Sequence, residues 1–138
     1  MASPSGPSHT HTVLIVEDSD DGRESLALLL ELSGHQVVAA RSAMEALQLM
    51  ITVGARPCVL IVDIILNGID GITLRGAMDR YPEIAGIPAI ALTGHEPLRR
   101  RASASGFASA LLKPCTPETL CETIERCCVA KRLLAKRA

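Results

Sequence analysis

Aromatic side chains are almost absent from this chain of 138 residues, which has no tryptophan, one tyrosine and one phenylalanine. Proteins that bind single-stranded nucleic acid stack its bases on aromatic rings, so this composition argues against such a surface. The formal net charge of −1 gives no general attraction to DNA or to an anionic membrane. We therefore expect neither nucleic acid nor a membrane among the partners.

Long apolar runs and paired cysteine motifs are lacking as well. No stretch approaches the roughly 18 apolar residues of a membrane span. The first residues, MASPSGPSHTHT, have neither the charged nor the apolar region of a secretory signal, so we expect a cytoplasmic protein. The five cysteines form an odd count without CxxC spacing, which argues against a disulfide framework or a zinc site.

The length of the chain favours one domain with a single core. Residues 1–11 consist mainly of Ser, Pro, Gly and His, and we expect them to form a disordered tail that includes His9 and His11. The domain itself is expected over 12–130. The basic residues in 131–138 are expected to form the end of a C-terminal helix or a tail, since cations are favoured at helix C-termini.

Short apolar runs alternate along the chain with segments of helical periodicity. The runs that we predict to be strands cover residues 13–17, 36–40, 59–63, 87–92 and 107–112. Five helices are expected between and after them, the last beginning at Thr116 as N-cap and Pro117. Strands that are apolar throughout and separated by helices predict an α/β fold, a doubly wound five-stranded parallel sheet with helices on both faces.

Polar residues stand where these strands end. They are Glu17 and Asp18 at the end of the first strand, Asp63 at the end of the third, Thr93 at the end of the fourth and Lys113 at the end of the fifth. In open sheets of this class, binding sites lie at the carboxyl ends of the strands. Asp63 interrupts the apolar run LIVDIILNGIDG, and a buried carboxylate needs compensating groups. We expect the other four residues to meet it at one edge of the sheet.

Such a set of residues could support phosphoryl transfer. Converging carboxylates raise each other's pKa unless a hard cation is bound among them, and Mg²⁺ prefers oxygen ligands. An ionised Asp63 could attack phosphorus and form an aspartyl-phosphate. Thr93 and Lys113 could bind the phosphoryl oxygens as charge develops on them.

Four segments, VLIVEDSDD, LIVDIILNGIDG, IALTGHEP and ASALLKPCTPETL, resemble the receiver domain of two-component response regulators over about residues 12–130. The resemblance implies a flavodoxin-like fold with strand order 2-1-3-4-5. It also implies that a histidine kinase or phosphotransfer protein phosphorylates Asp63. By the same resemblance Mg²⁺ is bound directly by Asp18, Asp63 and the carbonyl of Ile65, and through water by Glu17, while Lys113 precedes a proline in the cis form.

Two positions depart from the pattern of that family. Ala110 stands three residues before Lys113, where receivers usually carry an aromatic residue or histidine whose inward swing couples Thr93 to the output face. Asn67 occupies the place of a common proline, so we expect a less rigid loop after Asp63. Phe107 is expected to be a core residue and not a replacement for the missing aromatic.

The resemblance leaves two roles open. The first is a stand-alone receiver without an output domain, which is a signalling module and not an enzyme, and acts by phosphorylation-dependent protein–protein interaction. The alternative is a receiver module of a hybrid histidine kinase or phosphorelay that passes phosphate to a histidine phosphotransfer domain, since GFASALLKP resembles such receivers. An aspartyl phosphatase would need an acid where Ile65 stands. A flavin-binding module would need a Ser/Thr-rich phosphate loop and flanking aromatics, which are missing.

Overall fold

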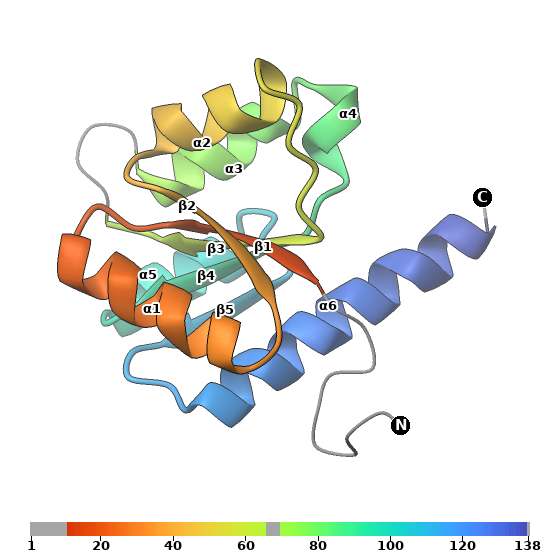
Figure 1. Cartoon of the computed structure of the whole chain (residues 1–138). Helices are drawn as coiled ribbons and strands as arrows, with labels where there is room; N and C mark the ends of the chain where they lie inside the picture. The colour runs from red at the N-terminus through yellow and green to blue at the C-terminus, as the bar shows by residue number, and fades with distance from the viewer. Residues whose placement is uncertain (1–10, 66–69, 138) are drawn as a thin grey trace, which may run out of the picture.

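The computed structural model describes residues 11–65 and 70–137, so Asn67 lies outside the described residues. Five strands and six helices lie within these ranges, and they alternate except that α3 and α4 follow one another (Figure 1). The strands are β1 (Thr12–Val16), β2 (Gln36–Ala40), β3 (Val59–Asp63), β4 (Ala89–Thr93) and β5 (Ser109–Leu112). The helices are α1 (Asp20–Leu32), α2 (Ala43–Ile51), α3 (Gly71–Met78), α4 (Pro82–Ala85), α5 (Glu96–Ser103) and α6 (Pro117–Arg137).

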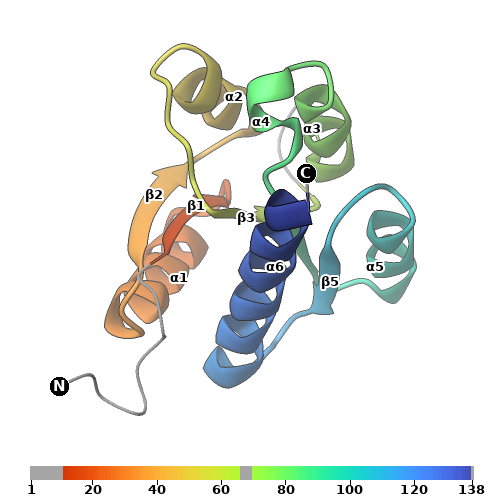
Figure 2. The ribbon, with the colours of Figure 1, turned by 90° about the vertical axis from the view of Figure 1, so that its right-hand side faces the viewer.

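The strands form one parallel sheet in the order β2-β1-β3-β4-β5, which confirms the predicted fold class. Helices α1 and α6 cover one face, and α2 to α5 cover the other (Figures 1 and 2). Three strands begin one or two residues away from their predicted starts. The first begins at Thr12, the fourth at Ala89 and the fifth at Ser109. The register pairs Asp63 with Leu92, so both central strands end at the same edge.

Two apolar clusters, one on each face, make up the core. Phe107, 7% exposed, belongs to the cluster under α2 to α5, as predicted. Cys127 and Cys128 are buried in the cluster under α1 and α6. The only helix that the sequence pattern missed among the described residues is α4, which begins at Pro82 and has four residues, too few to show a helical period.

The capping residues explain where several helices begin. A side-chain oxygen accepts a hydrogen bond from a backbone N–H of the first turn in each case. The pairs are Ser19 with Gly22 (3.2 Å), Ser42 with Glu45 (3.1 Å), Asp70 with Thr73 (2.7 Å) and Thr116 with Thr119 (3.1 Å). The predicted cap at Thr116 is therefore confirmed.

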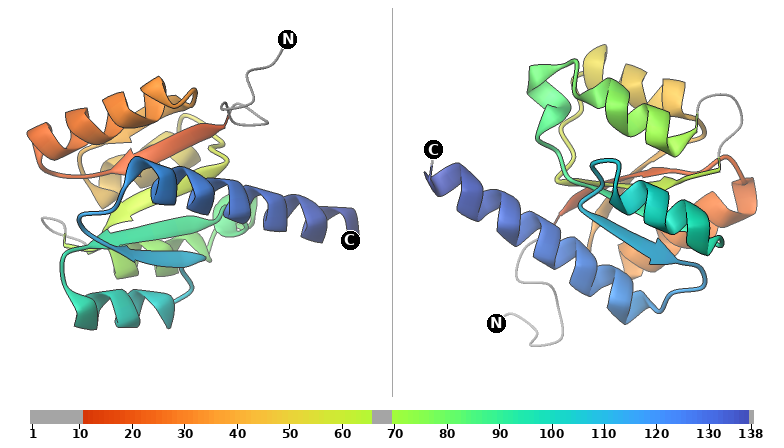
Figure 3. Two further views of the ribbon diagram at one scale, coloured as in Figure 1. Left: turned by 90° about the horizontal axis from the view of Figure 1, so that it is seen from below. Right: turned by 180° about the vertical axis from the view of Figure 1, so that it is seen from behind.

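Helix α6 is the longest helix, with 21 residues. Its C-terminal part extends beyond the amino ends of the strands, at the pole opposite the carboxyl ends (Figure 3). Across residues 11–65 and 70–137 no helix combines the length and the apolar character that a membrane crossing requires.

His11 belongs to the folded domain, so its assignment to a disordered tail is wrong. Its side chain is buried, and Nε2 lies 3.0 Å from Glu125 Oε1 of α6. Its carbonyl accepts a hydrogen bond from Gln36 N (2.9 Å), which extends the pairing of β1 and β2 by one residue. The ring of His35 lies beside it, with 5.6 Å between ring centroids.

Burial of His35 predicts a loss of stability in acid. The side chain is 4% exposed, and among the described residues its Nδ1 has no hydrogen-bond partner. Burial lowers the pKa of His35 below its usual 6.5, and His11 lowers it further, whereas Glu125 opposes the shift. His35 of the unfolded chain then binds the proton more tightly than His35 of the folded chain. The free energy of unfolding is therefore unaffected by protonation of His35 above pH 6.5 and decreases as the pH falls below that value.

We therefore expect His35→Leu to reduce the fall in melting temperature between pH ~7.5 and pH ~5.5 relative to the parent chain. The matched control is His95→Leu, because His95 is an exposed histidine before α5. Thermal unfolding followed by circular dichroism measures both. An equal change of melting temperature with pH in His35→Leu and His95→Leu would show that buried His35 does not cause the loss of stability in acid.

Candidate functional site

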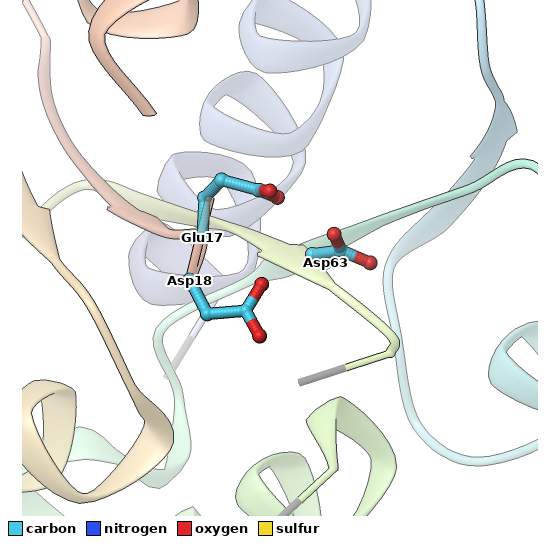
Figure 4. A group of neighbouring side chains, drawn as sticks. All are labelled: Glu17, Asp18 and Asp63. Carbon is cyan, nitrogen blue, oxygen red and sulfur yellow. The ribbon is translucent and has the colours of Figure 1, made fainter. Parts of the chain in front are cut away.

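The carboxyl edge of the sheet brings together three acidic side chains. Glu17 and Asp18 directly follow β1, and Asp63 is the last residue of β3. One carboxylate oxygen from each residue lies within 4.8 Å of the other two. Figure 4 shows the three side chains next to one another at the ends of the two strands. Pairing of β1 with β3 in the centre of the sheet is what places them together.

The Asp63 carboxylate is compensated on both oxygens. Oδ1 accepts a hydrogen bond from the backbone N–H of Ile65 (3.0 Å), and Oδ2 accepts one from Lys113 Nζ (3.2 Å). The Asp63 side chain is 13% exposed and that of Lys113 is 43% exposed. Lys113 Nζ also lies 3.7 Å from Glu17 Oε2, so one ammonium group serves two carboxylates. These contacts account for a carboxylate within an apolar strand.

One positive charge does not balance three carboxylates, and the pKa of the buried Glu17 is raised. Burial, a hydrogen bond with Asp63 and repulsion by the Asp63 charge raise the pKa of Glu17 to about 7, against the opposing effect of Lys113. A cation bound among the carboxylates would favour their charged forms. The donors are all oxygens, which fits Mg²⁺ better than a softer metal. The residues present therefore suit the ion that the resemblance implies.

Thr93 and Lys113 are neighbours through their backbones. The amide of Lys113 donates to the carbonyl of Thr93 (2.8 Å), and the Lys113–Pro114 bond is cis, as the resemblance implies. The Thr93 side chain is 1% exposed, and its Oγ1 accepts a hydrogen bond from His95 N (3.2 Å). Because Oγ1 is the acceptor in that bond, its own proton remains available to another group. The position of Thr93 is one residue beyond Leu92, the register partner of Asp63.

Ile65 and Ala110 complete the residues singled out from the sequence. Ile65 contributes its N–H to Asp63, while its side chain is 58% exposed. Binding of a metal by its carbonyl stays a prediction. Ala110 lies in β5, is partly buried and packs against the core on the side of α5. This small side chain stands where the resemblance to receivers implies an aromatic residue or histidine.

Sequence reasoning missed three residues that shape the site. Gly22 lies so close to the Glu17 carboxylate that a Cβ there would be 3.1 Å from Oε1, and a Cβ on Gly71 would be 2.8 Å from the carbonyl oxygen of Asp63. Arg23 donates from Nη1 to the carbonyl of Glu17 (3.1 Å). The glycine before a predicted helix could have indicated the close approach at Gly71, but no local signal points to Gly22 or Arg23.

Comparisons with known proteins agree with this geometry. The profile of the response regulator receiver domain family matches residues 13–125. An uncharacterised 14.6 kDa protein of Leptolyngbya boryana is 36% identical over 120 residues, covering 86% of this chain and 90% of that protein. Protein PilH of Pseudomonas aeruginosa is 31% identical over 114 residues, covering 81% of this chain and 93% of PilH.

A solved structure points the same way. The signal receiver domain of a signal transduction histidine kinase from Syntrophus aciditrophicus is 29% identical and superposes with a TM-score of 0.78, covering 88% of this chain and 92% of that one. The family profile spans most of the present chain, including the acidic cluster. This chain belongs to the response regulator receiver domain family.

Proposed function

We propose that this receiver domain accepts a phosphoryl group on Asp63 in the presence of Mg²⁺ from a histidine kinase or a phosphotransfer protein. The phosphorylated domain then signals by a changed affinity for a protein partner. The observation that carries the proposal is the position of the Asp63 carboxylate, which lies between two further carboxylates and the ammonium of Lys113. In this role the chain is a signalling module and not an enzyme.

Each residue has a distinct part in the reaction. A carboxylate oxygen of Asp63 attacks phosphorus, and the bond to the donor's nitrogen or oxygen breaks with its electron pair leaving on the donor. Lys113 Nζ, which lies 3.2 Å from Asp63 Oδ2, can transfer its hydrogen bond to a phosphoryl oxygen. The Thr93 hydroxyl can donate a hydrogen bond to a second phosphoryl oxygen.

Four residues would hold the ion. Asp18, Asp63 and the carbonyl of Ile65 would be direct ligands, and Glu17 would act through water. When bound, Mg²⁺ would neutralise the carboxylates and the transferring oxygens. The raised pKa of Glu17 agrees with this part of the proposal, because burial and then the neighbouring Asp63 disfavour its charged form more than Lys113 favours it.

The proposal is tested by incubating the protein with acetyl phosphate and weighing it intact. We expect the mass to increase by one phosphoryl group when Mg²⁺ is present and to stay unchanged when a chelator removes the ion. Absence of any increase at saturating Mg²⁺ would contradict the proposed function.

A second role, as a module of a phosphorelay, is favoured by the likeness to the receiver of the Syntrophus histidine kinase. It differs from the first role in the fate of the phosphoryl group. Mixing the labelled chain with a histidine phosphotransfer domain separates the two. Rapid movement of the label onto that domain supports the relay, whereas retention on Asp63 supports signalling by partner binding.

A further inference from the structure

Arg23, in the first turn of α1, contacts the backbone of the acidic pair. Its side chain is 14% exposed, and Nη1 donates a hydrogen bond to the carbonyl of Glu17 (3.1 Å). Nη2 forms an ion pair with Asp20 one turn earlier in the helix. The guanidinium group is therefore held from two sides, and one of its bonds crosses from α1 to the end of β1.

The carbonyl that Arg23 contacts belongs to the peptide bond between Glu17 and Asp18. A peptide unit is planar, so a bond that holds its oxygen also orients the Cα atoms on both sides. Those two Cα atoms carry two of the three carboxylates of the cluster. Arg23 thus acts on the acidic pair through the backbone carbonyl that lies between the two residues.

The same turn of α1 confines the Glu17 carboxylate. Ser19 N lies 3.4 Å from Glu17 Oε1, and the lack of a side chain on Gly22 leaves room for that oxygen. The orientation of Glu17 is therefore defined by α1 at the carboxylate and at the carbonyl. Only the carbonyl contact comes from a side chain that can be replaced without adding bulk to the site.

We propose that Arg23 is a positioning residue for the cation site, which orients the Glu17–Asp18 peptide so that both carboxylates face Asp63. This inference rests on the proposed function, since it assigns Arg23 a part in Mg²⁺ binding. Groups that orient metal ligands typically change metal affinity by about 10- to 100-fold when they are removed.

Electrostatics alone predicts a change in Mg²⁺ affinity of the opposite sign. Removing a cationic side chain near a cation site relieves repulsion, so charge alone would make Arg23→Ala bind Mg²⁺ more tightly. A positioning role makes the same variant bind Mg²⁺ more weakly. The direction of the change therefore decides between the two effects.

Arg75 of α3 is a closely matched control. Its side chain is also 14% exposed, it forms an ion pair with Asp79 on its own helix, and its Nε donates to a backbone carbonyl, that of Gly106 (3.1 Å). The loop that it holds lies before β5 and contributes no residue to the acidic cluster. Arg75→Ala thus removes equivalent bonds away from the site.

The experiment is calorimetric titration of Mg²⁺ into the parent chain, Arg23→Ala, Arg23→Lys and Arg75→Ala. We expect Arg23→Ala to weaken binding by about 10-fold and Arg75→Ala to change it by less than about twofold. Arg23→Lys keeps the charge but not the two-armed geometry, so its loss should be intermediate. Affinity of Arg23→Ala equal to or tighter than that of Arg75→Ala would overturn the inference.

A second readout separates positioning from a general loss of folded protein. In acetyl phosphate labelling, Arg23→Ala should need about 10-fold more Mg²⁺ for half-maximal rate and should reach the parent's rate at saturating Mg²⁺. A merely structural defect would lower the maximal rate and leave the half-saturating concentration unchanged. If Arg23→Ala does not fold, the inference survives only if Arg23→Lys also needs more Mg²⁺ than the parent for half-maximal rate and reaches the parent's rate at saturating Mg²⁺.

Mg²⁺ binding and labelling of the parent chain distinguish failure of the proposed function from failure of the inference about Arg23. If it neither binds Mg²⁺ nor is labelled, the proposed function fails and the inference fails with it. If it does both, and the Arg23 variants match Arg75→Ala, only the inference about Arg23 fails.

Discussion

Asp63→Asn is expected to take up no phosphoryl group from acetyl phosphate under conditions in which the parent chain is labelled. The amide has no negative charge with which to attack phosphorus, and it also removes one of the three carboxylates that would hold Mg²⁺. Intact mass after incubation with Mg²⁺ is the measurement. Because the change removes repulsion with Glu17, the variant should fold at least as well as the parent.

The control for this variant is Asp79→Asn, the same chemical change at the end of α3. The Asp79 side chain is 65% exposed and pairs with Arg75, away from the acidic cluster. We expect labelling at the parent's level. Uptake by Asp63→Asn that equals uptake by Asp79→Asn would mean that the acceptor is another residue.

Gly71→Ala is expected to destabilise the domain by about 1–3 kcal/mol, the usual cost of forcing an extra methyl group into a packed interior. A Cβ at this position would lie 2.8 Å from the carbonyl oxygen of Asp63 and 2.9 Å from Val62 Cγ1. The obstacle includes backbone that the sheet holds in place, and the amide of Gly71 donates to the carbonyl of Ile64 (3.1 Å). Neither α3 nor β3 can therefore withdraw without losing that bond.

Gly76→Ala tests the same substitution five residues later in the same helix. A Cβ on Gly76 would meet nothing within 4 Å, so the higher helix propensity of alanine should stabilise the domain by up to about 1 kcal/mol. Urea unfolding followed by circular dichroism gives both free energies. If Gly71→Ala is as stable as Gly76→Ala or more stable, the close approach at Gly71 has no energetic effect.

The parallel sheet and the residues at its carboxyl edge were predictable because both follow from local patterns, whereas the strand order followed from the resemblance to receiver domains. Five apolar runs separated by helical periodicity indicate a parallel sheet, and its strands end together. Glu17, Asp63 and Lys113 were therefore expected at one edge of the sheet once the strands were assigned. The distances among them, and the raised pKa of Glu17, depend on burial and side-chain direction, which a pattern of residue types does not contain.

The features that the sequence did not reveal depend on contacts between distant parts of the chain. His11 looks like the last residue of a polar tail, and it is buried because Glu125, 114 residues later, lies against it. Arg23 looks like an ordinary helix residue until the end of β1 is placed beneath it. Helix α4 is too short to have a period of its own.

The edge position of β5 has a consequence for the order in which the site is completed. Glu17 and Asp18 follow the inner strand β1 and Asp63 ends the inner strand β3, whereas Lys113 follows β5, which is paired with β4 alone. During synthesis on a ribosome, the acidic residues emerge long before residue 113, so a partly made domain has the charges without the ammonium that offsets them. Fraying of this last strand would recreate that state in the finished protein, so the offset of the acidic charge depends on the pairing of β5 with β4.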